Sequence, residues 1–296
     1  MLGDATNSAA PDVAAANATT LDRPRDGAYA ADLVRAAVCD DAFAWLARHG
    51  PVPAAALCEA MAWAARPTDV LLTLCAAHGL VERFVEADDL VTVSELARRH
   101  LAGGTSTALR PGGDPAAGRP AVAEFATVLR TDRPASGARA AACGTTGVDA
   151  REALLARGVA RTLDDLRVRR VLRVGDGAGT DVTAGLCDPW PRGWETHLLV
   201  DVLHHVDAGR VEQLLARSHD ALAPGGRLVD VDAHVDGRRT GPIPVAEYSA
   251  ALVHATPGKC WSVNELAGIA ARVGFAGVEV RRCVGDHSAL VFTRAS

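Results

Sequence analysis

The segment that decides the fold reads VLRVGDGAGT at residues 171–180 and resumes as LLVDVLHHVD at residues 198–207. The first stretch predicts a β-strand that runs into a glycine-rich turn, and the second predicts a later strand of the same sheet. Only residues 181–196 separate the turn from the core of the second strand. A crossover connection between parallel strands needs about a dozen residues, and Pro189 and Pro191 interrupt this interval. We therefore expect a parallel sheet from which strands have been lost.

The rest of the C-terminal half continues this α/β pattern, because short apolar runs alternate with amphipathic stretches. We expect further strands at residues 196–202, 227–232, 277–283 and 288–293, and helices at residues 208–222 and 263–273. Residues 167–296 are therefore expected to form one α/β domain.

The N-terminal half has a different pattern. Residues 28–102 predict three short helices followed by strand, acidic turn and strand in LVERFVEADDLVTV (80–93), which together are typical of a winged-helix domain. Residues 1–27 lack periodicity and are expected to be a disordered tail. Residues 103–166 are expected to hold a linker and further helices.

Composition excludes several classes of protein. The net charge is −5 and the candidate recognition helix is largely apolar, so we expect no nucleic-acid partner, and a DNA-binding regulator is the last alternative. No apolar run is long enough to span a bilayer, so we expect no membrane contact. The seven cysteines form no CxxC pair, which favours a reduced cytoplasmic protein without a metal site.

Several motifs together resemble one family. In order they are ARPTDVLLTLCAAHGLVE, VLRVGDGAG, DPWP, LLVDVLHHVDAGRVEQLLARSHDALAPGGRLVDVDA and TPGKCWSVNELAGIAARVGF. They resemble the small-molecule O-methyltransferases of bacteria and plants over residues 28–296. The resemblance implies a winged-helix domain that forms a homodimer, followed by a Rossmann-like catalytic domain. Here that domain is expected to be truncated and to lack strands 2 and 3.

The resemblance also implies a catalytic group. His204 stands at the position of the family's general base, and Asp232 and Glu265 stand where two acidic residues orient it, with Asp232 replacing the usual glutamate. The unperturbed pKa of histidine, about 6.5, suits proton abstraction near neutral pH. The alternative for His204 is a capping or core histidine without a catalytic role.

Four further residues are candidates for binding an aromatic small-molecule substrate. His254, Trp261 and Tyr248 are candidate pocket walls, although each also suits ordinary core or helix packing. His205 is included, but a continuous strand would direct it to the opposite face from His204 and favour a structural role.

The cofactor site of the family is altered in this sequence. Gly175, Gly177 and Gly179 preserve the turn, but Arg173 stands where the family usually has aspartate, and the strand that would supply an acid for the ribose is missing. Isolated glycine spacing is also typical of a tight strand-to-helix turn. We therefore interpret the three glycines as vestigial and expect no cofactor.

These observations favour an O-methyltransferase-like tailoring enzyme of bacterial secondary metabolism that acts on an aromatic polyketide without S-adenosylmethionine. Because a base that deprotonates a phenol also activates its ring carbons, we expect a Mannich-type C–N or C–C coupling, a condensation or a cyclisation. The chain also resembles methyltransferase-like proteins of aromatic polyketide pathways, and this resemblance implies installation of a hydrazine as one such coupling. The alternatives are an S-adenosylmethionine-dependent O-methyltransferase and a non-catalytic heterodimer partner.

Overall fold

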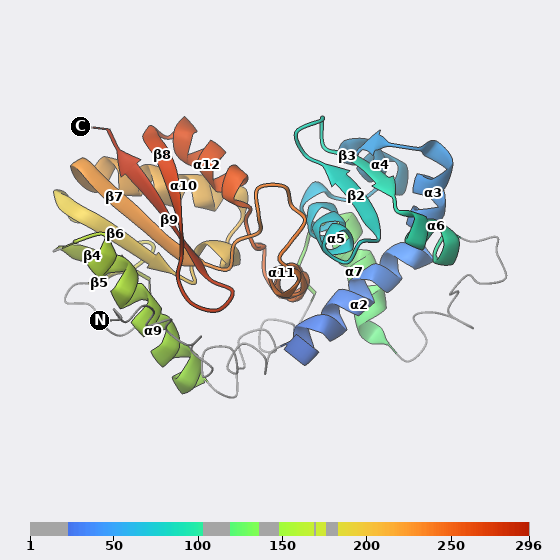
Figure 1. Cartoon of the computed structure of the whole chain (residues 1–296), viewed down its shortest axis with the longest axis horizontal. Helices are drawn as coiled ribbons and strands as arrows, with labels where there is room; N and C mark the ends of the chain where they lie inside the picture. Colours follow the sequence, from blue (N-terminus) through green and yellow to red (C-terminus); the bar gives the residue numbers. More distant parts are fainter. Residues whose placement is uncertain (1–22, 103–118, 136–147, 169, 176–182, 296) are drawn as a thin grey trace, which may run out of the picture.

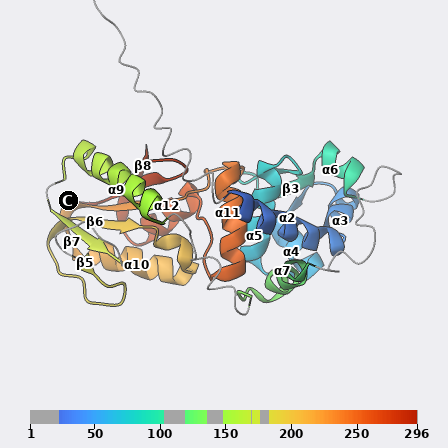
Figure 2. The ribbon, with the colours of Figure 1, turned by 90° about the horizontal axis from the view of Figure 1, so that it is seen from below.

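The computed structural model describes residues 23–102, 119–135, 148–168, 170–175 and 183–295. Within these ranges the chain forms an N-terminal lobe of helices with a small sheet and a second lobe built on a six-stranded sheet (Figure 1). Helix α11 (Ile243–Ala255) lies between the two lobes in both views (Figures 1 and 2). The helices of the described ranges are too short or too polar to cross a bilayer.

The N-terminal lobe combines helices with a three-stranded antiparallel sheet in the order β1-β3-β2. Its elements are α2 (Arg23–Cys39), α3 (Ala42–His49), β1 (Val52–Pro53), α4 (Ala54–Met61), α5 (Ala65–Ala77), β2 (Val81–Phe84), β3 (Leu90–Val93), α6 (Glu95–His100) and α7 (Pro120–Thr131). Helix α2 already begins at Arg23, inside the stretch expected to be a tail. Residues 1–22 and the expected linker at 103–118 lie outside the described residues.

The C-terminal lobe has a mixed sheet in the order β5-β4-β6-β7-β9-β8, in which β9 runs antiparallel to both of its neighbours. Its elements are α9 (Val148–Asp165), β4 (Val171–Val174), β5 (Thr183–Ala184), β6 (Trp194–Val200), the 3-10 turn η1 (Leu203–His205), α10 (Ala208–Ala221), β7 (Leu222–Asp232), α12 (Val263–Arg272), β8 (Phe275–Arg282) and β9 (Ser288–Arg294). The observed strands and helices follow the predicted ones closely.

Helices cover both faces of this sheet. Successive side chains of a strand point to opposite faces, so Leu198 of β6 packs with Leu155 of α9, while Leu199 packs with Leu214 of α10. Helices α10 and α12 share the second face, whose core is larger (Figure 1). Both faces of the sheet are therefore buried, as expected for a largely parallel arrangement.

The sheet extends beyond β4, on the side where strands 2 and 3 of the family were expected to be missing. Strand β5 pairs in parallel with Arg173 and Val174 of β4. The interval after the glycine turn is too short for a full crossover helix and a long strand, but it accommodates these two residues of β5. The outer edge of β4 is therefore paired at two positions.

Helix α11 connects the cores of the two lobes. Apolar residues surround nearly its whole circumference, as expected for a buried helix. Ala246 and Ala250 belong to the core of the N-terminal helices, whereas Val245 and Leu252 pack against the segment that follows β7. This position brings Tyr248, on the same helix, towards the carboxyl ends of the sheet strands.

Candidate active site

The candidate site lies at the carboxyl ends of β6 and β7, where open α/β sheets bind their ligands. Strand β6 ends at Val200, and Asp201 adopts a left-handed conformation with φ 55°. The chain then forms the 3-10 turn η1, which carries His204 instead of extending the strand. Asp232 is the last residue of the neighbouring strand β7.

His204 and Asp232 form a buried pair. The distance from Nδ1 of His204 to Oδ1 of Asp232 is 2.6 Å, and the two residues are 1% and 2% exposed. The backbone N–H groups of His204 and Ala233 also donate to the Asp232 carboxylate, at 3.3 and 2.7 Å. An ionised carboxylate only accepts hydrogen bonds, so Nδ1 of His204 carries a proton, and in the neutral imidazole the lone pair is on Nε2.

Charge keeps the aspartate of this pair ionised. Burial by itself raises the pKa of Asp232, but the charge and hydrogen bond of His204, with smaller contributions from His234 and His287, hold that pKa well below its usual range. Asp201 behaves similarly. Burial raises its pKa, but the hydrogen bond from Nε2 of His287, at 2.8 Å, together with the charges of His287 and His204, lowers the pKa more than burial raises it.

Two side chains lie close to Nε2 of His204. The Tyr248 hydroxyl is 3.1 Å away, and Nε2 of His205 is 3.0 Å away. The prediction that His205 points to the opposite face is wrong, because both histidines lie on the turn η1 and not on a strand. Burial, with a smaller contribution from His204, lowers the pKa of His205 to about 4. His205 is therefore neutral at physiological pH.

Trp261 and His254 have other positions. Trp261 lines the cavity between the two lobes, in agreement with its prediction as a pocket wall. The indole N–H of Trp261 donates to the carbonyl of Leu203 at 2.9 Å, so Trp261 supports the turn from behind. His254 faces the N-terminal lobe, where its Nε2 lies 2.7 Å from Oε2 of Glu124 and its ring packs against Phe125. The interpretation of His254 as a pocket wall beside His204 is therefore replaced by a helix-packing role.

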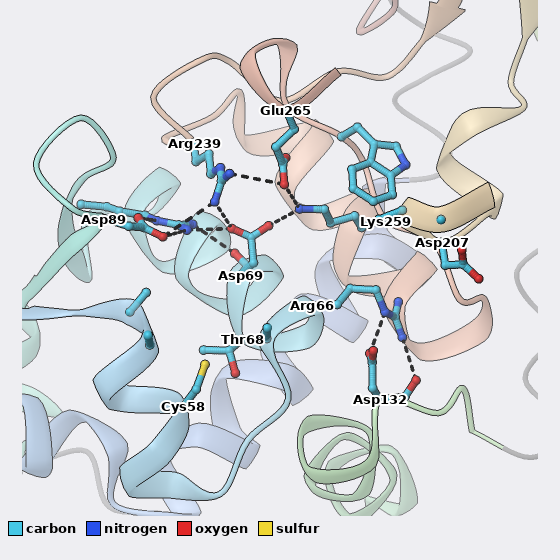
Figure 3. A pocket seen from close by; sticks show the side chains of 17 residues that line it. Cys58, Arg66, Thr68, Asp69, Asp89, Asp132, Asp207, Arg239, Lys259 and Glu265 are labelled. Carbon is cyan, nitrogen blue, oxygen red and sulfur yellow. Dashed lines mark hydrogen bonds and ion pairs between the residues drawn. The ribbon is translucent and has the colours of Figure 1, made fainter. Parts of the chain in front are cut away.

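Glu265 does not lie beside His204 as the sequence motif implied. Its Oε2 accepts hydrogen bonds from the backbone and hydroxyl of Ser262, forming a capping box at the start of α12. Its Oε1 lies 2.6 Å from Nζ of Lys259 and 3.3 Å from Nη2 of Arg239. The structure thus assigns the Glu265 carboxylate to an ion-pair cluster (Figure 3).

This cluster, called here the Asp69 cluster, lines a cavity of about 560 Å³ between the two lobes (Figure 3). Its members are Asp69, Arg83, Asp89, Arg239, Lys259 and Glu265. Asp69 contacts the three cationic side chains together. Burial raises the pKa of Asp69, but these cations, Lys259 first, lower it far more. Because positive and negative groups pair throughout, the arrangement is suited to joining the lobes.

Sequence reasoning missed several residues of the region. Asp201 and His287 pair beside the candidate base, and Cys260 is buried near Asp232, whose charge adds to burial in raising the pKa of the thiol. Lys259 is the single lysine of the sequence, but that fact alone does not indicate where the residue lies or what it contacts. Gly258 packs directly against the backbone of His204.

Two described residues, Gly175 and Asp201, are suited to binding a cofactor. Gly175 follows β4 with φ 106°, and a β carbon there would lie 3.2 Å from the Val202 side chain, so this turn requires glycine. Gly177 and Gly179 lie outside the described residues. At the end of the adjacent strand β6, the Asp201 side chain is 33% exposed and presents a carboxylate towards the same edge. A glycine turn with a nearby carboxylate fits a cationic nucleoside cofactor.

A metal ion has weaker support in this region. Asp201, His204 and Asp232 each offer a donor atom within 4.8 Å of the others. All three side chains already have hydrogen-bond partners in the protein. We therefore assign this cluster to hydrogen bonding.

Comparison with known proteins gives a consistent result. Residues 172–276 match the O-methyltransferase domain family. The acetylserotonin O-methyltransferase of Gallus gallus is 32% identical over 88 residues, which cover 30% of this chain and 25% of that protein. The demethylspheroidene O-methyltransferase of Rhodobacter capsulatus is 35% identical over 98 residues, which cover 32% and 24%. The 3-hydroxy-5-methyl-1-naphthoate 3-O-methyltransferase of Streptomyces sahachiroi is 26% identical, covering 38% and 44%. The chain thus matches less than half the length of these curated relatives.

A solved structure is similar over nearly the whole chain. The O-methyltransferase family 2 protein from Planctomyces limnophilus, in complex with apigenin, superposes with a TM-score of 0.74 at 22% identity and covers 94% of this chain and 96% of that one. At this identity the likeness shows the fold, an α/β methyltransferase-like arrangement.

These findings correct two expectations. A coupling or cyclising enzyme without S-adenosylmethionine, and with no cofactor at all, conflicts with relatives that are named O-methyltransferases. The loss of cofactor binding was inferred from the short interval after the glycine turn. The turn at Gly175 and the carboxylate of Asp201 are nevertheless present in the structure. Residues 172–276 match the O-methyltransferase domain family, and over part of its length the chain is similar to small-molecule O-methyltransferases.

Proposed function

We propose that the protein is an S-adenosylmethionine-dependent O-methyltransferase that acts on the hydroxyl group of an aromatic small molecule. One observation supports this most directly. The 2.6 Å contact with Asp232 orients His204 so that its Nε2 lone pair lies within hydrogen-bonding distance of a phenol oxygen, that of Tyr248. A base of this kind is what transfer to a hydroxyl group requires.

In this proposal His204 is the general base. Its Nε2 accepts the proton of the substrate hydroxyl, and the imidazolium that forms is stabilised by the ionised Asp232 carboxylate. S-adenosylmethionine supplies an electrophilic methyl group for the resulting oxygen nucleophile. We assign Gly175 and Asp201 to holding this cofactor, because they supply the backbone turn and a partly exposed carboxylate, one oxygen of which accepts from His287.

The substrate class is supported by the relatives. The Streptomyces sahachiroi protein is named for a hydroxynaphthoate, and the Planctomyces limnophilus structure contains the polyphenol apigenin. A role in tailoring aromatic natural products therefore fits this chain. His205 and Tyr248, which surround Nε2, are the side chains that we assign to the acceptor side of the site.

We further propose that residues 28–102 form a winged-helix domain that makes a homodimer. The three-stranded sheet with helices α3, α4 and α5 supports this assignment. Residues 103–166 would connect it to a shortened Rossmann-like domain, residues 167–296, in which the two-residue strand β5 replaces strands 2 and 3 of the family. Size-exclusion chromatography with light scattering tests the dimer.

The function is tested by incubating the protein with S-adenosylmethionine and a panel of phenols and naphthols, with product masses measured by chromatography–mass spectrometry. We expect a mass increase of one methyl group for a phenolic acceptor. His204→Asn should lower the rate by about 10²-fold or more while retaining S-adenosylhomocysteine binding in calorimetry. His49→Asn, an exposed histidine of α3, is the matched control. Wild-type protein that neither binds S-adenosylhomocysteine nor methylates any acceptor would refute the proposal.

A further inference from the structure

Tyr248 contacts the candidate base although it comes from a helix that belongs largely to the other lobe. Its hydroxyl lies 3.1 Å from Nε2 of His204, and the two rings are 5.5 Å apart at an interplanar angle of 70°. Nδ1 of His204 is already engaged by Asp232. Tyr248 therefore donates to the one nitrogen through which His204 can act as a base.

The contact also covers the base. His204 is 1% exposed, whereas Tyr248, in contact with its Nε2, is partly exposed. The other neighbour of Nε2, the His205 ring, lies 3.0 Å away with its centroid 4.0 Å from that of His204. A substrate hydroxyl must therefore take the place of one of these two groups to reach Nε2.

The geometry of Tyr248 is that of a bound phenol. A group that loses its proton to a base must lie within hydrogen-bond reach of it, about 2.6–3.2 Å between heavy atoms. The Tyr248 hydroxyl satisfies this distance, with its aromatic ring oriented edge-to-face against the imidazole. An acidic hydroxyl on an aromatic ring is thus already accommodated at Nε2.

We propose that the Tyr248 side chain occupies the subsite of the acceptor hydroxyl, and that a phenolic substrate displaces it. This inference rests on the proposed function, in which His204 is the base. The Nε2 atom has a single lone pair in its plane, so the tyrosine phenol and a substrate phenol compete for it. Tyr248 therefore controls access of a substrate hydroxyl to the base.

A purely structural role for Tyr248 predicts different behaviour. If the hydroxyl only orients the imidazole, removing the side chain loosens His204 and creates no affinity for a free phenol. If Tyr248 occupies the acceptor subsite, removing it leaves a space of phenol size beside Nε2. Binding of a free phenol to a truncated variant separates the two roles.

The test uses p-cresol, which reproduces the tyrosine side chain, and measures its dissociation constant by ligand-observed NMR. We expect Tyr248→Ala to bind p-cresol at least about 10-fold more tightly than wild type, which corresponds to about 1.4 kcal/mol. The gain should disappear in the double variant Tyr248→Ala/His204→Phe, which keeps a ring but removes the nitrogen acceptor. Tyr29→Ala, the other tyrosine of the chain, is the control and should show no comparable gain that depends on His204.

Circular dichroism establishes that each variant is folded, and Tyr248→Leu replaces Tyr248→Ala if the alanine variant is not. A folded variant that binds p-cresol no more tightly than wild type overturns the inference, as does a gain that persists without the His204 nitrogen. Because p-cresol binding requires no S-adenosylmethionine, failure of methyl transfer by the wild type would refute the proposed function separately from this result.

Discussion

Gly258 lies directly against the backbone of His204. A β carbon at Gly258 would collide with the carbonyl oxygen of His204 and would lie 2.7 Å from the carbonyl carbon of His205. Neither atom can move without distorting the turn η1. The segment that contains Gly258 thus packs against the turn that carries the candidate base, although it is more than fifty residues away in sequence.

Gly258→Ala is therefore expected to destabilise the protein by more than about 2 kcal/mol and to abolish any activity that depends on His204. Gly268 in α12 is the matched control, because a β carbon there meets nothing within 4 Å. Gly268→Ala should stabilise the protein by about 0.5–1 kcal/mol through helix propensity. Urea unfolding of both variants measures the difference. Equal effects of the two substitutions would contradict the contact.

Asp232→Asn tests the buried pair. The amide keeps the shape of the carboxylate but loses its charge, so the imidazolium is no longer stabilised and Nδ1 is no longer held in one protonation state. We expect methyl transfer to fall by about 10²-fold or more, with little change in S-adenosylhomocysteine affinity. Asp232→Glu, the residue usual in the family, should retain more activity than Asp232→Asn. The reverse order would argue against an orienting role.

Secondary-structure elements that show a clear apolar run or helical periodicity were predicted from the sequence. Strands β6 and β9 contain the apolar runs LLV (198–200) and ALVF (289–292), and α10 and α12 show helical periodicity, so the predicted bounds of these elements lie within two residues of the observed ones. Strand β7 begins at Leu222, before its predicted start at 227. The pairing of His204 with Asp232 followed from their motif positions at the ends of adjacent strands. These features depend on short stretches of chain and on sheet geometry, which sequence displays directly.

The errors concern long-range packing and local turns. His205 was misplaced because the left-handed residue Asp201 ends the strand, which periodicity does not reveal. His254 was misplaced because nothing in the sequence shows that α11 inserts into the N-terminal lobe. Glu265 carried a readable signal, since Ser262 three residues before it completes a capping-box pattern. That local pattern predicted a cap more reliably than the motif predicted a catalytic role.

Lys259 provides a test of the Asp69 cluster. Its ammonium group is 5% exposed, contacts Asp69 of α5, and lies 2.6 Å from Oε1 of Glu265 in α12. Lys259→Met removes a cation that both carboxylates share, but Asp69 keeps Arg83 and Arg239 and Glu265 keeps Arg239. We therefore expect a loss of about 1–3 kcal/mol in the free energy of unfolding. Arg99→Met, which breaks the exposed pair with Glu95, should change it by no more than about 0.5 kcal/mol.

The accessibility of Lys259, the single lysine, can also be measured by chemical modification. Acetylation with an N-hydroxysuccinimide ester, read by peptide mass spectrometry, should leave Lys259 unmodified in the folded protein and modify it after denaturation. Rapid modification of the native protein would show that the cavity between the lobes opens freely, and would remove the case for the cluster as a connection between them.

His197 predicts how stability depends on pH. It lies on β6, is fully buried, and its Nδ1 is 2.9 Å from the Ser218 hydroxyl. Burial lowers its pKa from 6.5 to about 4. Between these values the unfolded chain binds a proton that the folded chain does not, so lowering the pH from 6.5 towards 4 favours unfolding. Above pH 6.5 this residue contributes no pH dependence. The full effect is about 3 kcal/mol.

The measurement compares wild type with His197→Asn by guanidinium unfolding at several pH values between 4 and 7.5. Asparagine retains a polar contact for Ser218 but does not titrate, so subtracting the two curves isolates His197 from other groups such as His205. The stability advantage of the wild type should shrink as the pH falls from 6.5 towards 4 and stay constant above 6.5. A difference independent of pH would mean that His197 is protonated, or accessible to water, in the folded protein.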